Sequence, residues 1–257
     1  MYEKILKKLV KNKFYVYFCN SNRKTNTMKK TNIFKSLAVA AALLFTAQSA
    51  NAQLEQSVFL NAGMPLGQFH QKLNTTPMPT VFGKENIAKE TTIGFGLGYR
   101  AGFVFDIGYG EVTPFLSADL LWNQTSSKYR DQSATLGYKI PNYFNIPILI
   151  GVNYRYGITD IITAFGEFGV GYDAFFITPE GKKGTLDPYA KYKTGGALAW
   201  QVGVGSYFGN HFSVGIHYYG LGKHTINYKK QANLPDLGST NELRSLGSLN
   251  LRIGFHF

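Results

Sequence analysis

At positions 249–257 the chain reads Leu-Asn-Leu-Arg-Ile-Gly-Phe-His-Phe. Apolar residues alternate with polar or small ones up to the last position, and a period of two places the two sets on opposite faces of a β-strand. An amphipathic edge strand of a soluble sheet would show the same pattern. A strand that closes a membrane-spanning β-barrel also carries it, because its outer face meets lipid and its inner face a polar interior.

The start of the chain helps to choose between these alternatives, because it predicts export. A basic head and an apolar stretch rich in Ala and Leu, together residues 28–47, precede the small-x-small sequence Ala50-Asn51-Ala52. This is the pattern of a secretory signal peptide, which is too short to span a bilayer as a helix. Cleavage after Ala52 would leave Gln53 as the first mature residue.

The chain is therefore divided into three parts. Residues 1–27 are interpreted as a mis-assigned start, with an extended basic head of the signal as the alternative. Residues 28–52 are the predicted signal peptide, and residues 53–257 the predicted mature domain. The first 52 residues hold ten of the 27 Lys and Arg residues but only one of the 15 acidic residues, so the mature part carries a net charge of only +3.

This distribution of charge and cysteine excludes some classes of function. With a net charge of +3 the mature domain loses the basic character that nucleic-acid binding needs, so no nucleic-acid partner is expected. The single cysteine, Cys19, lies in the part that is removed. The mature domain therefore has no disulfide and no cysteine for catalysis or metal binding.

Alternating patterns predict eight strands with a regular rhythm of connections. Three connections are short and four are long, and they alternate. No stretch of the mature part has 18 consecutive apolar residues, and without helices only a closed barrel can span a membrane. We therefore predict an all-β fold, an eight-stranded antiparallel up-and-down transmembrane β-barrel with short turns in the periplasm and long loops outside. The predicted strands are 54–64, 91–105, 112–124, 142–156, 161–176, 195–208, 211–223 and 245–257, and the predicted long loops are 65–90, 125–141, 177–194 and 224–244.

The two faces of the predicted strands separate this fold from a soluble eight-stranded barrel, whose outer face would be mostly polar. Over 142–156 every second residue from Phe144 to Tyr156 is apolar or aromatic, and the same holds from Ile93 to Phe105. Tyr and Phe gather near strand ends, as they do at bilayer interfaces. The other face carries glycines and polar residues, so we expect it to line the lumen.

Six charged residues fall on the predicted lumen face, three basic and three acidic. An eight-stranded barrel is only wide enough for its lumen to be filled by side chains, and an unpaired charge there would be costly. We therefore expect these residues to neutralise one another in a hydrogen-bonded plug that gives no stable ion conductance and excludes a general porin. They are Arg100, Asp119, Arg155, Glu167, Asp173 and Arg252.

One segment carries a resemblance to a known family. Residues Tyr143 to Val152 read Tyr-Phe-Asn-Ile-Pro-Ile-Leu-Ile-Gly-Val, and a proline inside a strand is normally kept to edges or bulges. This run, together with the signal peptide and the aromatic end, resembles the outer-membrane β-barrel domain common in Bacteroidetes, which includes the PorT-like proteins and is similar to small OmpA- or OmpX-type barrels. The resemblance implies an integral protein of the cell outer membrane, with Phe255 and Phe257 as the C-terminal assembly signal. PorT itself is linked to protein secretion across that membrane.

The sequence favours a barrel without catalytic activity. No Gly-x-Ser-x-Gly elbow is present. His217 and His256 point inward without a third ligand, so we expect no metal site and no cofactor. Three classes remain open: a structural or surface-interaction barrel, an accessory subunit of a secretion complex, and a lipid-modifying enzyme with His224 and a loop serine. We favour the first.

The expected partners follow from the charge of the connections. The long loops are basic, and the short turns hold Asp106, Glu111 and Asp160 without a base. We therefore expect contact with outer-membrane lipid and the phosphates of lipopolysaccharide, with ordinary loop solvation as the alternative. The other expected partners are the barrel-assembly machinery and, for the second class, secretion-complex proteins. The loop lysines singled out are Lys182, Lys183, Lys229 and Lys230.

Overall fold

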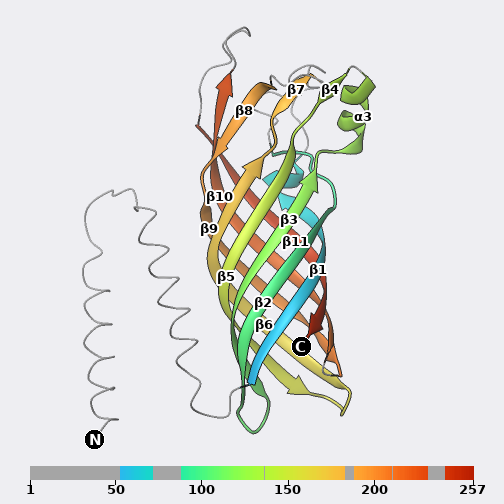
Figure 1. Cartoon of the computed structure of the whole chain (residues 1–257), viewed down its shortest axis with the longest axis vertical. Coiled ribbons are helices and arrows are strands. Elements are labelled where there is room, and N and C mark those ends of the chain that lie inside the picture. The colour runs from blue at the N-terminus through green and yellow to red at the C-terminus, as the bar shows by residue number, and fades with distance from the viewer. Residues whose placement is uncertain (1–52, 72–87, 136, 183–187, 210, 231–240) are drawn as a thin grey trace, which may run out of the picture. The chain divides into compact units, whose positions relative to one another are not determined.

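The computed structural model describes residues 53–71, 88–135, 137–182, 188–209, 211–230 and 241–257. The predicted signal peptide, including Ala50 and Ala52, lies outside the described residues, as do residues 1–27. Eight long strands form a closed antiparallel barrel (Figure 1), because β1 pairs with β2 on one side and with β11 on the other. These strands are β1 (Gln53–Gly67), β2 (Gly94–Asp106), β3 (Glu111–Gln124), β5 (Asn142–Gly157), β6 (Ile162–Ile177), β9 (Ala197–Phe208), β10 (Phe212–Lys230) and β11 (Asn241–His256).

The short connections all lie at one end of the barrel and the long ones at the other. We call these the turn end and the loop end. At the turn end, short turns join β2 to β3, β5 to β6 and β9 to β10. At the loop end, the 3-10 helix η1 (Gln68–His70) follows β1, and the helix α3 (Ser127–Thr135) follows β3. In the part of the chain that the structure describes, no helix is long and apolar enough to cross a membrane.

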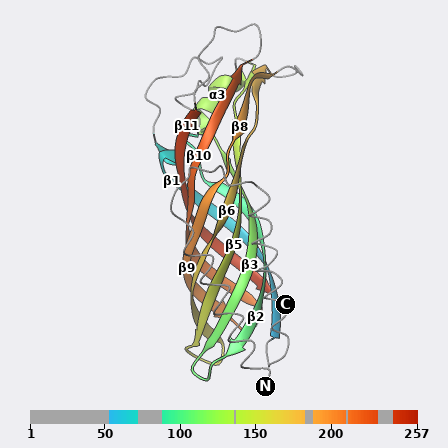
Figure 2. The ribbon, with the colours of Figure 1, turned by 90° about the vertical axis from the view of Figure 1, so that its left-hand side faces the viewer.

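The loop end is more ordered than the sequence predicts. Two of the expected loops contain strands of their own: β4 (Tyr138–Lys139) lies in 125–141, and β7 (Glu180–Lys182) and β8 (Pro188–Thr194) lie in 177–194. β8 pairs with the upper part of β10, and β7 then β4 extend the sheet. We give the name outer extension to β8, to the part of β10 after Gly222 and to the part of β11 that pairs with it. Figure 2 shows the outer extension rising above the barrel wall.

The predicted loop 224–244 is thus wrong over much of its length. β10 runs on to Lys230 and pairs with β11 as far as the rung Asn227↔Asn241. β10 continues this far because pairing with β8 and β11 satisfies its main-chain N–H and C=O groups beyond the bilayer. The sequence of 224–244 lacks the apolar alternation of the strands in the barrel wall, so it predicts a loop.

The predicted faces are the observed ones in the barrel strands. Outward residues such as Phe95 and Leu198 are 62% and 76% exposed, whereas the lumen-facing alternates are buried. Phe103 is an exception, since its register places it beside outward residues and yet it is only 6% exposed.

Pro147 sits inside β5, which has a neighbour on both sides. Towards β6 it is opposite Asp173 in the ladder. Towards β3, the regular pairing stops at Ala118↔Ile148 and resumes at Leu121↔Asn145. The proline lies within this gap, where its missing N–H costs no ladder hydrogen bond.

Candidate functional site

The lumen is the candidate site, because the eight strands turn their polar side chains into it. Its middle holds a network of ion pairs between residues on β2, β3, β6 and β11. Arg100 Nη2 lies 2.7 Å from Glu167 Oε1, and Arg252 Nη2 lies 3.0 Å from Asp119 Oδ1. Arg252 Nη1 also lies 3.5 Å from Glu167 Oε1, which joins the two pairs into one network. The four side chains are at most 3% exposed.

Neutral side chains add further hydrogen bonds to this network, although Arg100 Nε has no hydrogen-bond partner among the described residues. Glu167 accepts from the amides of Asn153 and Gln201, each at 3.0 Å, and lies 3.0 Å from His217 Nε2. Asp119 accepts from Asn61 and from the Tyr219 hydroxyl, both at 3.2 Å. A buried ion pair recovers its desolvation cost only when such partners satisfy its remaining atoms. The middle of the lumen is therefore closed by bonded side chains.

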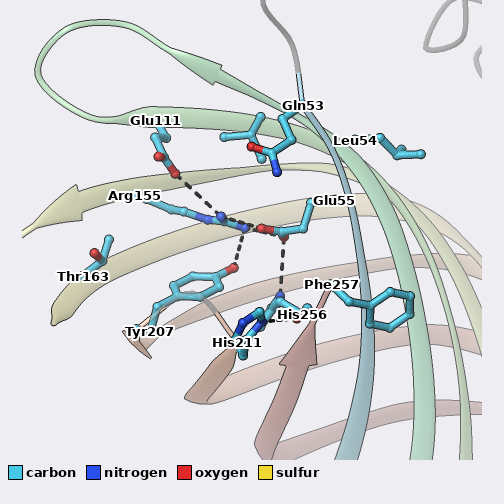
Figure 3. A pocket seen from close by; sticks show the side chains of 12 residues that line it. Gln53, Leu54, Glu55, Glu111, Arg155, Thr163, Tyr207, His211, His256 and Phe257 are labelled. Carbon is cyan, nitrogen blue, oxygen red and sulfur yellow. Dashed lines mark hydrogen bonds and ion pairs between the residues drawn. The ribbon is translucent and has the colours of Figure 1, made fainter.

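A second cluster lies at the turn end, around Arg155 (Figure 3). Its Nη1 and Nη2 donate to the two oxygens of Glu55 at 2.7 and 2.5 Å, a bidentate pair. Nη2 also donates to the Tyr207 hydroxyl at 2.8 Å, and the guanidinium lies 4.1 Å from the centre of the Tyr207 ring. Glu111 is further away, 3.6 Å from Nη1, and its side chain is 46% exposed.

His256 joins this cluster to the seam between β1 and β11. Its Nδ1 lies 2.7 Å from Ser57 Oγ and 3.4 Å from Glu55 Oε1, and its Nε2 lies 2.7 Å from Ser213 Oγ. A serine, a histidine and a carboxylate in this order can activate a nucleophile. The cavity beside them, about 440 Å³, is lined by His256 and Glu55 but by neither serine. Because a substrate there would not meet either hydroxyl, the cluster is better suited to holding the seam.

The loop end of the lumen is closed by a group of buried apolar side chains, the apolar cap. Phe69, carried by η1, packs edge-on against Tyr143 and Phe175. The Tyr143 hydroxyl accepts a hydrogen bond from the main-chain N–H of Ala88, which ties Ala88 to β5. The members of the apolar cap are Phe69, Ala88, Tyr129, Tyr143, Leu149, Phe175, Ala199, Tyr219, Leu221, Ile226 and Leu246.

Asp173 lies beside the apolar cap, with partners of its own. Its Oδ2 accepts from the Asn145 amide at 2.6 Å and lies 3.1 Å from His224 Nε2. Asp173, Asn145 and His224 are all fully buried. His224 was expected in a loop, but it lies on β10 where that strand enters the outer extension.

The structure brings four of the six predicted lumen charges into one network and places two elsewhere. Arg155 is close to the turn end and Asp173 close to the loop end, because each lies too far along its strand to reach the middle. Sequence reasoning missed Glu55 and His224, the partners of these two residues. Glu55 stands in the inward phase of the first strand, so the alternation could have found it.

The remaining predicted positions lie at the turn end. Gln53 is the first residue of β1 and lines the cavity. Phe255 faces outward on β11, and the main chain of Phe257 exchanges hydrogen bonds with Gln56 at 2.9 and 3.0 Å. Among the side chains that the structure describes, no group of three His, Cys, Asp or Glu residues is arranged to hold a metal ion.

An apolar outer face, a polar lumen and alternating short and long connections define an integral β-barrel of an outer membrane. The chain belongs to the family described as outer membrane protein beta-barrel domain, whose sequence model matches residues 37–257. It is accordingly an integral protein of the outer membrane. No curated protein matches the chain.

Solved structures of small outer-membrane barrels are similar to it. The outer membrane enzyme PagL is 17% identical, over 77% of this chain and 97% of that one, with a TM-score of 0.36. Neisserial surface protein A is 8% identical over 80% and 98%, with a TM-score of 0.40. Ail, the attachment invasion locus protein of Yersinia pestis, is 12% identical over 81% and 100%, with a TM-score of 0.36. At these identities and scores the likenesses carry no argument about function.

Proposed function

We propose that this barrel has no catalytic activity and acts at the cell surface through its loop end, with a lumen that is not an open pore. The observation that carries the proposal is the ion-pair network of Arg100, Glu167, Arg252 and Asp119, which fills the middle of the lumen. The apolar cap lies above it. Because side chains fill the lumen at two levels, the surfaces of the barrel, rather than its interior, are available for function.

The charge at the two ends supports contact between the loop end and anionic lipid headgroups. Exposed side chains at the loop end include Lys139, Lys193 and Lys223, and also Arg130, which lies 3.8 Å from the exposed Asp131, whereas the short turns expose Asp106 and Asp160. With the loop end outside, the basic side faces the phosphates of lipopolysaccharide. Lys183 lies outside the described residues, as do the side chains of Lys182, Lys229 and Lys230.

Binding of lipopolysaccharide to the purified barrel tests this proposal. The double variant Lys193→Gln with Lys223→Gln should bind it several-fold more weakly, and added salt should weaken binding further, because exposed charges are screened. Asp160→Asn, which changes one charge at the turn end, is the matched control and should bind as the parent protein does. Binding that is unaffected by salt and by the double variant would rule out a charge-driven contact.

An accessory role in protein secretion is the second candidate, and the resemblance of Tyr143–Val152 to PorT-like barrels of Bacteroidetes supports it. The turn end is then the natural docking side, since it faces the periplasm. In-cell cross-linking of a tagged copy, followed by mass spectrometry, separates the candidates. Near-stoichiometric capture of secretion-complex proteins would favour this role, and capture of lipopolysaccharide alone would favour the free-standing barrel.

A lipid-modifying enzyme is the least favoured candidate. It would need His224 free to activate a serine, but both ring nitrogens face other partners: the carbonyl oxygens of Gly195 and Leu221 and the carboxylate of Asp173. Phospholipid hydrolysis by the pure barrel that is lost in His224→Gln would contradict the non-enzymatic proposal.

Maturation completes the proposal. We infer removal of the signal peptide after Ala52, which leaves Gln53 at the start of β1. The barrel-assembly machinery would then recognise the strand that carries Phe255 and Phe257. The mass of the protein isolated from outer membranes tests the cleavage site, since a chain that begins at any other residue has a different mass.

A further inference from the structure

The hydrogen bonds of His224 restrict its protonation state. Nδ1 lies 2.8 Å from the carbonyl oxygen of Gly195, and Nε2 lies 2.7 Å from the carbonyl oxygen of Leu221. Carbonyl oxygens only accept hydrogen bonds, and a neutral imidazole has only one N–H to donate. Both contacts are made together only if both nitrogens carry a proton, so the geometry requires the imidazolium form.

Asp173 supplies the charge that balances this cation. Its Oδ2 lies 3.1 Å from Nε2, and both side chains are fully buried. The other groups around the ring come from four elements. Asn145 on β5 donates to Asp173, Phe175 on β6 lies 5.2 Å from the ring centre, and Ala197 on β9 is buried nearby. Arg244 is opposite His224 in the β10–β11 ladder.

The two carbonyl groups belong to irregular points of the sheet. Leu221 is the extra residue of a bulge in β10, where the register with β11 shifts between Gly220 and Gly222. Gly222 has a φ of 81°, a left-handed conformation that favours glycine. Gly195 lies between β8 and β9, and its N–H donates to the Thr225 carbonyl oxygen at 2.9 Å. His224 therefore satisfies two main-chain acceptors that the regular ladder does not satisfy. Both acceptors lie at the base of the outer extension.

We propose that His224, as a buried imidazolium, is a proton-controlled pin that fastens the outer extension to the barrel wall. In the protonated state it joins the bulge of β10, the β8–β9 connection and Asp173 of β6. Loss of one proton leaves a ring lone pair facing a carbonyl oxygen and leaves the Asp173 carboxylate without its cation. The pin then releases β8 and the upper part of β10. This goes beyond the proposed surface role and does not depend on the ligand of the loops.

The direction of the pH dependence follows from the same contacts. His224 comes after Lys223, whose exposed charge marks the end of the apolar outer face on β10, so His224 lies outside the bilayer. Burial by itself lowers the pKa of His224, but the hydrogen bonds to Asp173, Gly195 and Leu221 outweigh it and hold the pKa above its usual value. The pin is therefore fully present below the ordinary pKa of about 6.5 and is lost as the pH rises through the raised value.

Two measurements on the whole barrel in nanodiscs test the proposal. Nitrogen NMR of histidine-labelled protein reports the two ring nitrogens directly, and at pH 6 both nitrogens of His224 should carry a proton. Hydrogen exchange, corrected for the intrinsic effect of pH, should accelerate at high pH by about tenfold or more in 188–196 and 220–230, since a hydrogen bond to a charged group is lost. Residues 94–105 of β2 serve as the internal reference.

Three variants identify the residue responsible. His224→Gln has one donor nitrogen and cannot span both carbonyl groups, so it should exchange fast at every pH. Asp173→Asn keeps the imidazole and its shape but removes the charge, and should move the transition to lower pH. His211→Gln, at the turn end, should keep the transition unchanged. A neutral His224 at pH 6, or an imidazolium whose deprotonation leaves exchange in the outer extension unchanged, would overturn the proposal.

Discussion

At the scale of the residue, Arg155 and Glu55 show how this barrel holds charge away from water. Arg155 is 8% exposed and Glu55 14%, and the pair is bidentate. Removing one partner of such a pair leaves a charge that is neither solvated nor compensated, which costs more than the pair itself contributes. Glu111, close to the same guanidinium, is half exposed and remains solvated.

We predict that Glu55→Gln destabilises the barrel by about 3 kcal/mol, because Arg155 then lacks its buried carboxylate. Glu111→Gln is the matched control, and a solvated ion pair of this kind contributes at most about 1 kcal/mol. Urea unfolding of the barrel in detergent micelles measures both. Equal losses in the two variants would show that burial does not decide the strength of these pairs.

At the scale of the element, the strands are set by close packing as much as by alternation. Gly171 and Gly166 both lie on β6. A Cβ on Gly171 would stand 2.0 Å from the carbonyl oxygen of Ile148 and 2.9 Å from the Leu149 Cα, both on the neighbouring main chain. A Cβ on Gly166 would meet open space. The same strand therefore contains one position that forbids a side chain and one that tolerates it.

We expect Gly171→Ala to cost roughly 1–3 kcal/mol, since β5 and β6 would have to move apart. Gly166→Ala should fold as the parent chain does. Refolding yield, read as the fraction of heat-modifiable barrel on a gel, distinguishes the two. A normal yield for Gly171→Ala would show that the rungs Ile148↔Tyr172 and Leu149↔Gly171 are looser than described.

The apolar cap is the element that fixes the loop end. Phe69 is fully buried on a short 3-10 helix, so Phe69→Ala should cost about 3–5 kcal/mol locally and make the buried Lys89 accessible to trypsin. Phe95→Ala removes the same side chain from the lipid-facing surface, where Phe95 is 62% exposed, and should leave Lys89 protected. Limited proteolysis of intact cells reads this difference, and equal cleavage of both variants would count against a cap.

The sequence predicts the eight barrel strands because each carries a period of two over ten or more residues. It does not predict β4, β7, β8 or α3, whose residues are mostly polar and whose order comes from pairing above the barrel. Four of the six lumen charges could be assigned to one network from their positions in the alternating pattern of the strands. The pairing of Arg155 with Glu55 and of Asp173 with His224 depends on position along tilted strands, which phase alone leaves open.

At the scale of the whole molecule, the barrel has three levels between its ends. The cavity of about 440 Å³ opens at the turn end, the ion-pair network crosses the middle, and the apolar cap closes the loop end. The outer face meets lipid along the strands, and the outer extension stands above it. We therefore propose that the function of the protein lies in surfaces beyond the bilayer and that the lumen contributes stability.

Single-channel recording of the purified barrel in a planar bilayer tests whether the lumen is closed. We expect no reproducible conductance steps in 1 M salt, because the ion-pair network and the apolar cap leave ions no path. A sixteen-stranded porin in the same bilayer serves as the positive control. Uniform steps that scale in number with the amount of pure protein would show that the lumen is an open pore.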